Sequence, residues 1–161
     1  MRFTAEHQFP APPSAVVDLL IDPDFMTTVE LPDLALPTIL VHEVSDTAAR
    51  LQLRYEYVGQ IDALAKRVIG GRDLTWVQDL RLDRTSNTGE LTFTAEAAPD
   101  KLKARAAVAI TPTASGSVRT LNGDFSIGVP LIGGTAERKI LPGVLRRLDV
   151  EAAAVAAQLA S

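Results

Sequence analysis

Residues 117–160 read SVRTLNGDFSIGVPLIGGTAERKILPGVLRRLDVEAAAVAAQLA, and this stretch decides the fold. Up to about Pro130, apolar and polar residues alternate, which is the period of a β-strand with one buried face. From about Thr135 to Ala160 the apolar residues recur with a period of 3.6, which predicts one long helix. Because each pattern can bury its apolar side only against the other, we expect this helix to pack on a sheet.

The predicted helix has one apolar and one polar face. The apolar face carries Ile140, Leu141, Val144, Leu145, Leu148, Ala152, Val155 and Leu159. The opposite face, expected to be polar, carries Arg146, Arg147, Glu151 and Gln158. Thr135 is the expected N-cap. Pro142 lacks a backbone donor, so we expect a kink or a restart of the helix there.

The rest of the chain is rich in period-2 alternation, which predicts further strands. Alternating stretches occupy residues 2–9, 38–45, 50–58, 73–83, 90–98 and 103–111. Turn residues between most of them indicate an antiparallel meander. Short helical patterns occupy residues 14–21, 25–31 and 61–69. The predicted fold class is therefore α+β, with seven antiparallel strands and a long C-terminal helix.

Length and composition indicate an ordinary globular domain. The 161 residues, of which 47% are hydrophobic, suit one domain over residues 1–161. A net charge of −4 argues against nucleic acid as a partner. Since the chain contains no Cys, it has no disulfide, no zinc site of the cysteine type and no thiol nucleophile.

No stretch of the sequence resembles a targeting or membrane segment. The N-terminal residues MRFTAEH lack the apolar core of a signal peptide, and no run approaches 18 apolar residues. We therefore expect a cytoplasmic protein without integral membrane association.

The order β-α-α-β6-α, with a long C-terminal helix available to lie in a concave sheet, resembles the helix-grip fold of the SRPBCC (START, Bet v 1-like) superfamily. Residues 9–20 and Asp22-Pro23-Asp24-Phe25 are similar to the superfamily's entry into its first helix and the end of that helix. The insertion 59–71, Leu74-Thr75-Trp76 and residues 129–134 resemble the DUF2505 family. The superfamily includes lipid carriers, hormone receptors, cyclases, oxygenase domains and chaperone activators, so the resemblance leaves the function open.

The alternation predicts which side chains point into the concave side of the sheet. We expect a mostly apolar ligand pocket, with a few polar groups that orient a ligand, or else a filled core between helix and sheet. The candidate pocket residues are His7, Tyr55, Tyr57, Trp76, Gln78, Phe93, Ala106, Phe125 and Leu148.

No catalytic residue, metal site or cofactor is predicted. The imidazole of His7 suits acid or base chemistry, but a hydrogen-bonded core histidine explains it as well. His42 lies on a strand that can neighbour that of His7, yet no metal-ligand motif accompanies the two. Lys66, Arg67 and Arg72 form a basic cluster that borders the pocket mouth or is simply a solvated helix face.

Three functions fit these observations. The first is the non-catalytic binding or transport of a small hydrophobic or amphipathic ligand that is lipid- or polyketide-like. The second is an enzyme of the cyclase or aromatase kind, in which His7 or a Tyr moves protons. The third is a protein-interaction module whose cavity is closed by packing. The ligand and the oligomeric state stay open.

Overall fold

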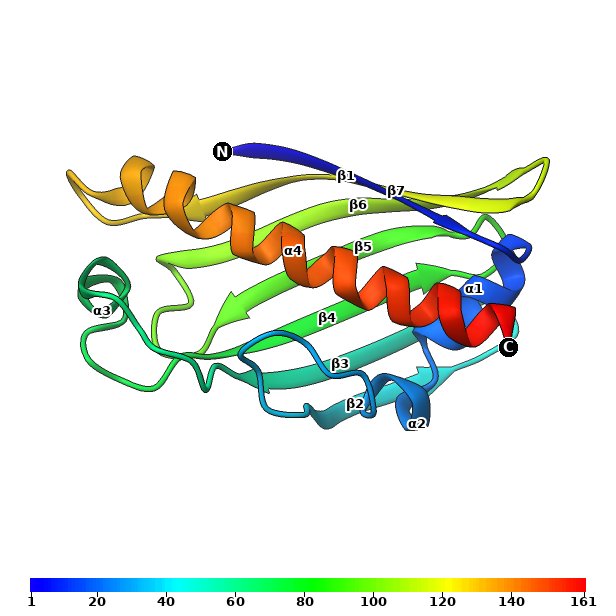
Figure 1. The fold of residues 1–161 in the computed structure, drawn as a ribbon, viewed down its shortest axis with the longest axis horizontal. Helices are drawn as coiled ribbons and strands as arrows, with labels where there is room; N and C mark the ends of the chain where they lie inside the picture. Colours follow the sequence, from blue (N-terminus) through cyan, green and yellow to red (C-terminus); the bar gives the residue numbers. More distant parts are fainter.

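The computed structural model describes residues 1–161 and contains a seven-stranded antiparallel sheet with four helices. The strands are β1 (Arg2–Phe9), β2 (Thr38–Val44), β3 (Ala48–Glu56), β4 (Thr75–Asp83), β5 (Thr88–Ala95), β6 (Leu102–Thr113) and β7 (Gly116–Ile127). The helices are α1 (Pro13–Leu20), α2 (Pro23–Met26), α3 (Ala63–Ile69) and α4 (Gly133–Ala160). Helix α4 runs along one face of the sheet (Figure 1), and this arrangement confirms the predicted helix-grip fold.

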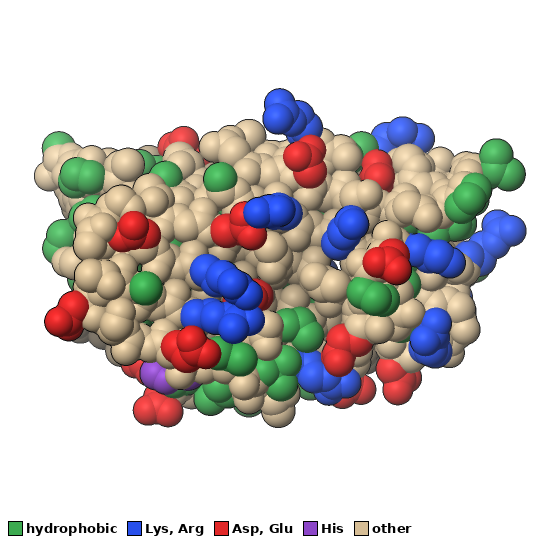
Figure 2. Space-filling view, turned by 180° about the vertical axis from the view of Figure 1, so that it is seen from behind, with side chains coloured by type: hydrophobic (Ala, Val, Ile, Leu, Met, Phe, Trp, Pro, Cys, Tyr) green, Lys and Arg blue, Asp and Glu red, His purple; other side chains and the backbone are tan.

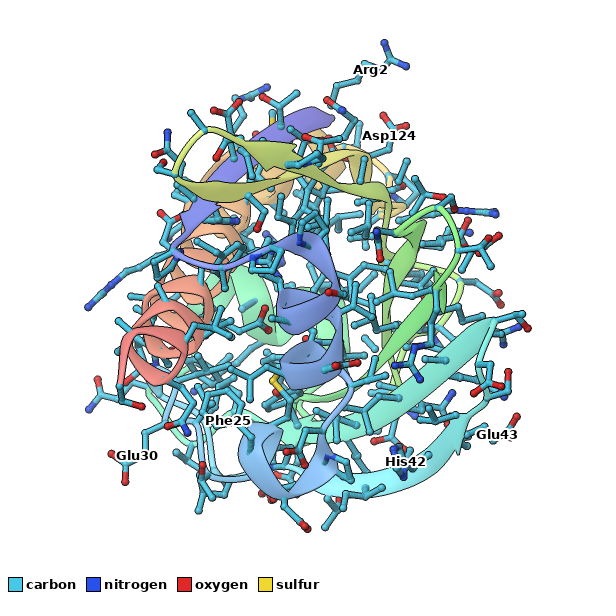
Figure 3. All side chains as sticks on the ribbon, turned by 90° about the vertical axis from the view of Figure 1, so that its right-hand side faces the viewer. Arg2, Phe25, Glu30, His42, Glu43 and Asp124 are labelled. Carbon is cyan, nitrogen blue, oxygen red and sulfur yellow. The ribbon has the colours of Figure 1, made fainter.

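The sheet has the order β1-β7-β6-β5-β4-β3-β2, so β1 and β2 form its two edges. Every pair from β2 to β7 consists of strands consecutive in the chain, as the turn signals predict, and β1 joins the far side of β7. Seen along its length, the sheet curves around the helices (Figure 3). Its concave side therefore provides the space between sheet and α4.

The core fills the α1 end of this space. Val16, Val17 and Leu20 of α1 are almost completely buried, as are Ala152 and Val155 near the C-terminal end of α4. Together with inward-facing residues of β6 and β7 they form one continuous apolar cluster. This end of the space therefore holds the main apolar core.

Helix α4 begins at Gly133, two residues before the expected start, so the prediction of Thr135 as N-cap is wrong. A Cβ atom at Gly133 would lie 2.3 Å from the carbonyl oxygen of Ile127, so only glycine permits this close entry. The helix continues through Pro142, so the restart, one of the two expected outcomes there, does not occur. No helix of the structure has the length and apolar character needed to cross a membrane.

Helix α2 is a single turn over Pro23–Met26, where residues 25–31 were expected to be helical. The Asp22 side chain accepts hydrogen bonds from the backbone N–H groups of Asp24 and Phe25. Pro23 takes the first helical position, where its missing donor is not needed. These two start signals place the helix earlier than the apolar spacing of the sequence indicates.

The outer face of the sheet is charged and exposed to solvent. Figure 2 shows acidic and basic side chains interspersed over the face seen from behind. Several of them pair across neighbouring strands, such as Arg50 with Asp79 and Arg105 with Glu90. A ligand site for an apolar molecule is therefore to be sought on the concave side.

Candidate functional site

A pocket of about 360 Å³ lies between the concave face of the sheet and the middle of α4, residues 139–151. Strands β3 to β7 contribute its floor, whereas α3 with the residues before it and the segment from Leu31 to Leu34 contribute its rim. Of the 27 lining residues 16 are hydrophobic. This size and composition are those of a site for a small, mostly apolar molecule.

Most of the predicted pocket residues meet in this space. Tyr55 and Trp76 stand opposite each other on β3 and β4, with ring centroids 5.9 Å apart and planes inclined by 25°. Gln78 of β4 is paired in register with Phe93 of β5. The predicted residues that line the pocket are Tyr55, Tyr57, Trp76, Gln78, Phe93, Phe125 and Leu148.

Ala106 does not line the pocket, which corrects its prediction. It has the right phase in β6 but lies one inward position further towards α1, where it belongs to the packed apolar cluster. Ala104, the preceding inward residue of β6, faces the pocket in its place. The phase of a strand decides which face a residue joins, whereas the pocket occupies only one part of that face.

His7 also lies outside the pocket, in a polar cluster between β1, β7 and α4. Its Nε2 atom is 2.9 Å from Oδ1 of Asp149, and its Nδ1 atom is 3.1 Å from Nη2 of Arg119. Because a guanidinium can only donate, Nδ1 must accept, and Nε2 then carries the proton that Asp149 accepts. His7 is thus a neutral, fully partnered histidine of the core rather than a free acid or base.

This arrangement makes the stability depend on pH. Burial, followed by the positive charge of Arg119, lowers the pKa of His7 below its ordinary value of 6.5, against the opposing effect of Asp149 and Glu151. The unfolded chain therefore binds more protons than the folded one once the pH falls below about 6.5, and stability falls with it. We expect His7→Gln to lose this pH-dependent part of the stability. When the pH is lowered from about 7.5 to about 5.5, the urea midpoint of the variant should therefore fall less than that of the wild type. Equal falls in the two proteins would contradict the assignment.

Arg119 and Glu151 form a buried ion pair beside His7. Arg119 Nη1 lies 2.9 Å from Oε1 of Glu151, and the two side chains are 3% and 5% exposed. The guanidinium also stands over the ring of Phe9, 5.8 Å from its centroid. Glu151, expected on the polar face of the helix, is therefore buried and lines the pocket at the same time.

Arg147 contacts the rim of the pocket, although the sequence pattern placed it on the polar face of the helix. Its Nε atom donates to the carbonyl oxygen of Pro32 at 3.0 Å, and its guanidinium lies 5.5 Å from the centroid of Tyr57. Burial lowers the pKa of Arg147. A second link joins Lys139 of α4 to Asp62, the N-cap of α3, at 2.9 Å. Both segments of the rim are thus tied to α4.

The other candidate charges lie elsewhere. Lys66, Arg67 and Arg72 are exposed and do not line the pocket. Lys66 and Arg67 occupy the last turn of α3, where positive charge stabilises a helix end. His42 lies on the edge strand β2 (Figure 3), at the opposite side of the sheet from His7, so the expected neighbourhood of the two histidines is wrong.

A long helix held in the concave side of a seven-stranded antiparallel sheet is the helix-grip fold. The chain belongs to the family described as "Protein of unknown function (DUF2505)", whose model matches residues 4–159. No curated protein matches the sequence at a significant level.

Solved structures with this fold cover almost the whole chain. TTHA0849 from Thermus thermophilus is 14% identical, with a TM-score of 0.71 over 99% of this chain and 97% of that one. The Zhui aromatase/cyclase from a Streptomyces species is 16% identical, with a TM-score of 0.63 over 99% and 92%. A STAR-related lipid transfer protein from Xanthomonas axonopodis is 17% identical, with a TM-score of 0.60 over 99% and 86%. At these identities the likeness establishes the fold alone.

Proposed function

We propose that this protein binds a small hydrophobic or amphipathic molecule, lipid-like or polyketide-like, in the pocket beneath α4, and carries it without chemical change. The observation that supports this most is the pocket itself, about 360 Å³ in volume, with hydrophobic residues at 16 of its 27 lining positions. Burial of apolar ligand surface releases about 25 cal/mol per Å². The binding free energy then comes mainly from the burial of apolar ligand surface against the walls of the pocket.

The geometry of the rim also supports this function. Arg147 and Lys139 tie the two rim segments to α4, so the pocket is largely formed before a ligand enters. Preorganisation of this kind lowers the entropic cost of binding. Trp76 lines the pocket and is the only tryptophan of the chain, so its emission reports on the site alone.

Ala104→Phe tests the proposal because it fills the pocket. Ala104 stands between Phe93 and Phe125 in the sheet register, and both neighbours line the pocket. We expect decanol to change the Trp76 emission of the wild type saturably, and Ala104→Phe to weaken this binding by about tenfold or more, since the new ring occupies the space of the ligand.

Ala107→Phe is the matched control, because Ala107 lies on the same strand but is exposed on the outer face of the sheet. It should bind decanol like the wild type, and thermal melts should show that both variants fold. A saturable response of the same affinity in Ala104→Phe and in the wild type would place the binding elsewhere. A wild-type protein that responds to no apolar probe would favour the interaction module.

A second candidate function, an enzyme acting on a polyketide-like substrate, draws on the polar side chains of Tyr55, Gln78 and Glu151 in the pocket. Two observations weigh against it. His7, one of the expected proton carriers, is held outside the pocket by Asp149 and Arg119. Burial raises the pKa of Tyr55, so its hydroxyl stays protonated at neutral pH and does not act as a base. Mass spectrometry of a poly-β-ketone thioester recovered after incubation with the protein distinguishes the enzyme from the carrier, because cyclisation with loss of water changes the mass of the thioester.

A further inference from the structure

Two buried polar side chains on the floor of the pocket have no hydrogen-bond partner in the protein. Tyr55 is 2% exposed and Gln78 is 7% exposed, yet neither the Tyr55 hydroxyl nor the Gln78 amide forms a side-chain hydrogen bond. The polar atoms of these two side chains are not fully enclosed by protein. The only fully enclosed side-chain polar atom without a hydrogen-bond partner is Ser117 Oγ. Both residues line the pocket, and because their polar atoms are not fully enclosed by protein, we infer that these atoms reach its interior.

These two groups lie close together on one face of the sheet. Tyr55 of β3 is in register with Trp76 of β4, and Gln78 is the next inward residue along β4. Such diagonal neighbours stand roughly 7–8 Å apart at their backbones, which long side chains span. A buried donor or acceptor without a protein partner is destabilising unless water or a ligand bonds to it. A ligand that supplies hydrogen-bond partners to both groups should therefore bind more tightly than a ligand of the same size that makes only apolar contacts.

The charge nearby limits what such a ligand carries. Glu151 also lines the pocket, and its negative charge adds to burial in raising the pKa of Tyr55. An anion bound at the Tyr55 hydroxyl would lose its water beside this carboxylate, whose charge Arg119 already balances. Cationic groups lie at the rim instead, where Arg147 and Lys139 line the pocket.

We propose that Tyr55 and Gln78 form a polar subsite that binds a neutral hydroxyl or carbonyl oxygen of the ligand. The Tyr55 hydroxyl donates to this oxygen, and the Gln78 amide donates to a carbonyl or accepts from a hydroxyl. The apolar remainder of the ligand then lies along Trp76, Phe93 and Phe125. This inference rests on the proposed function and narrows its ligand class to neutral alcohols and ketones with an apolar skeleton.

Tyr57 provides a matched control for Tyr55. It also lines the pocket, but its hydroxyl already donates to the carbonyl oxygen of Gln60 at 3.2 Å. Tyr55→Phe and Tyr57→Phe therefore remove the same atom from the same pocket, and only the first removes an unpartnered donor. Gln78→Met, which keeps the side-chain length without the amide, gives a second and independent variant.

Calorimetric titration with decanol and with decanoate, which share one apolar chain, tests the subsite. We expect Tyr55→Phe and Gln78→Met each to weaken decanol binding about five- to tenfold, the effect of one lost hydrogen bond. Tyr57→Phe should stay within about twofold of the wild type. Decanoate, whose carboxylate is directed to the rim, should lose no more than about twofold in any variant.

Equal decanol affinities in the wild type, Tyr55→Phe and Gln78→Met would overturn the subsite while leaving the proposed function standing. A loss in Tyr57→Phe as large as that in Tyr55→Phe would overturn it as well, because the partnered hydroxyl should contribute nothing new. If the wild type binds neither probe, the proposed function fails and the subsite fails with it. Thermal melts of each variant establish that the folded protein is compared.

Discussion

Arg119→Met is expected to lower the free energy of unfolding by about 3–5 kcal/mol, because it leaves the Glu151 carboxylate buried without its partner. The carboxylate is 5% exposed and depends on the guanidinium for its short ion pair. His7 loses the donor to its Nδ1 atom in the same substitution. Urea denaturation followed by circular dichroism measures the loss. Arg2→Met, at a side chain that is 93% exposed, is the control and should change stability by less than about 0.5 kcal/mol.

The double variant Arg119→Met with Glu151→Leu separates the charge effect from packing. Replacing both partners of a buried ion pair by apolar side chains often leaves the stability unchanged. Removing only one partner is strongly destabilising, because the other charge stays buried without a partner. We therefore expect the second substitution to recover most of the loss. A double variant as unstable as Arg119→Met alone would show that the destabilisation does not come from an unpaired carboxylate.

Leu148→Ala is expected to cost about 2–5 kcal/mol, through lost burial and the space left behind. Leu148 is 3% exposed and lies in the main core cluster as well as on the wall of the pocket. Arg138→Ala on the exposed side of the same helix should stay within about 0.5 kcal/mol of the wild type. Equal denaturation midpoints for these two variants would contradict the burial of α4 against the sheet.

The fold was predictable because its signals are periodic and repeated. Each strand carries a period-2 pattern and α4 a period of 3.6, and only one layered arrangement buries both. The sequence pattern was less informative about Arg147 and Glu151, since a single apolar stripe assumes one covered face. In the structure α4 is also covered by the segment around Pro32, so a second face is partly buried.

The sequence predicted which side of the sheet the pocket residues face, but not which part of each strand lines the pocket. The alternation correctly directs Tyr55, Trp76 and Gln78 inwards, yet it cannot tell the open end of the groove from the end that α1 fills, and Ala106 was misplaced for this reason. Arg119 was missed, although it shares the inward phase of Leu121 and Phe125, and a charge in that phase is a signal for a buried partner. Other lining residues, such as those from Leu31 to Leu34, lie in an irregular segment that has no periodicity to interpret.

The central claim is that the pocket beneath α4 is the binding site, and intermolecular nuclear Overhauser effects from bound decanol test it most directly. We predict contacts from the methylene protons of decanol to the rings of Trp76, Phe93 and Phe125, which line the pocket. The main alternative is adhesion to the apolar side chains exposed on the edge strand β2, which are Ile39, Leu40 and Val44. Contacts to those three side chains, with none to the pocket rings, would contradict the account.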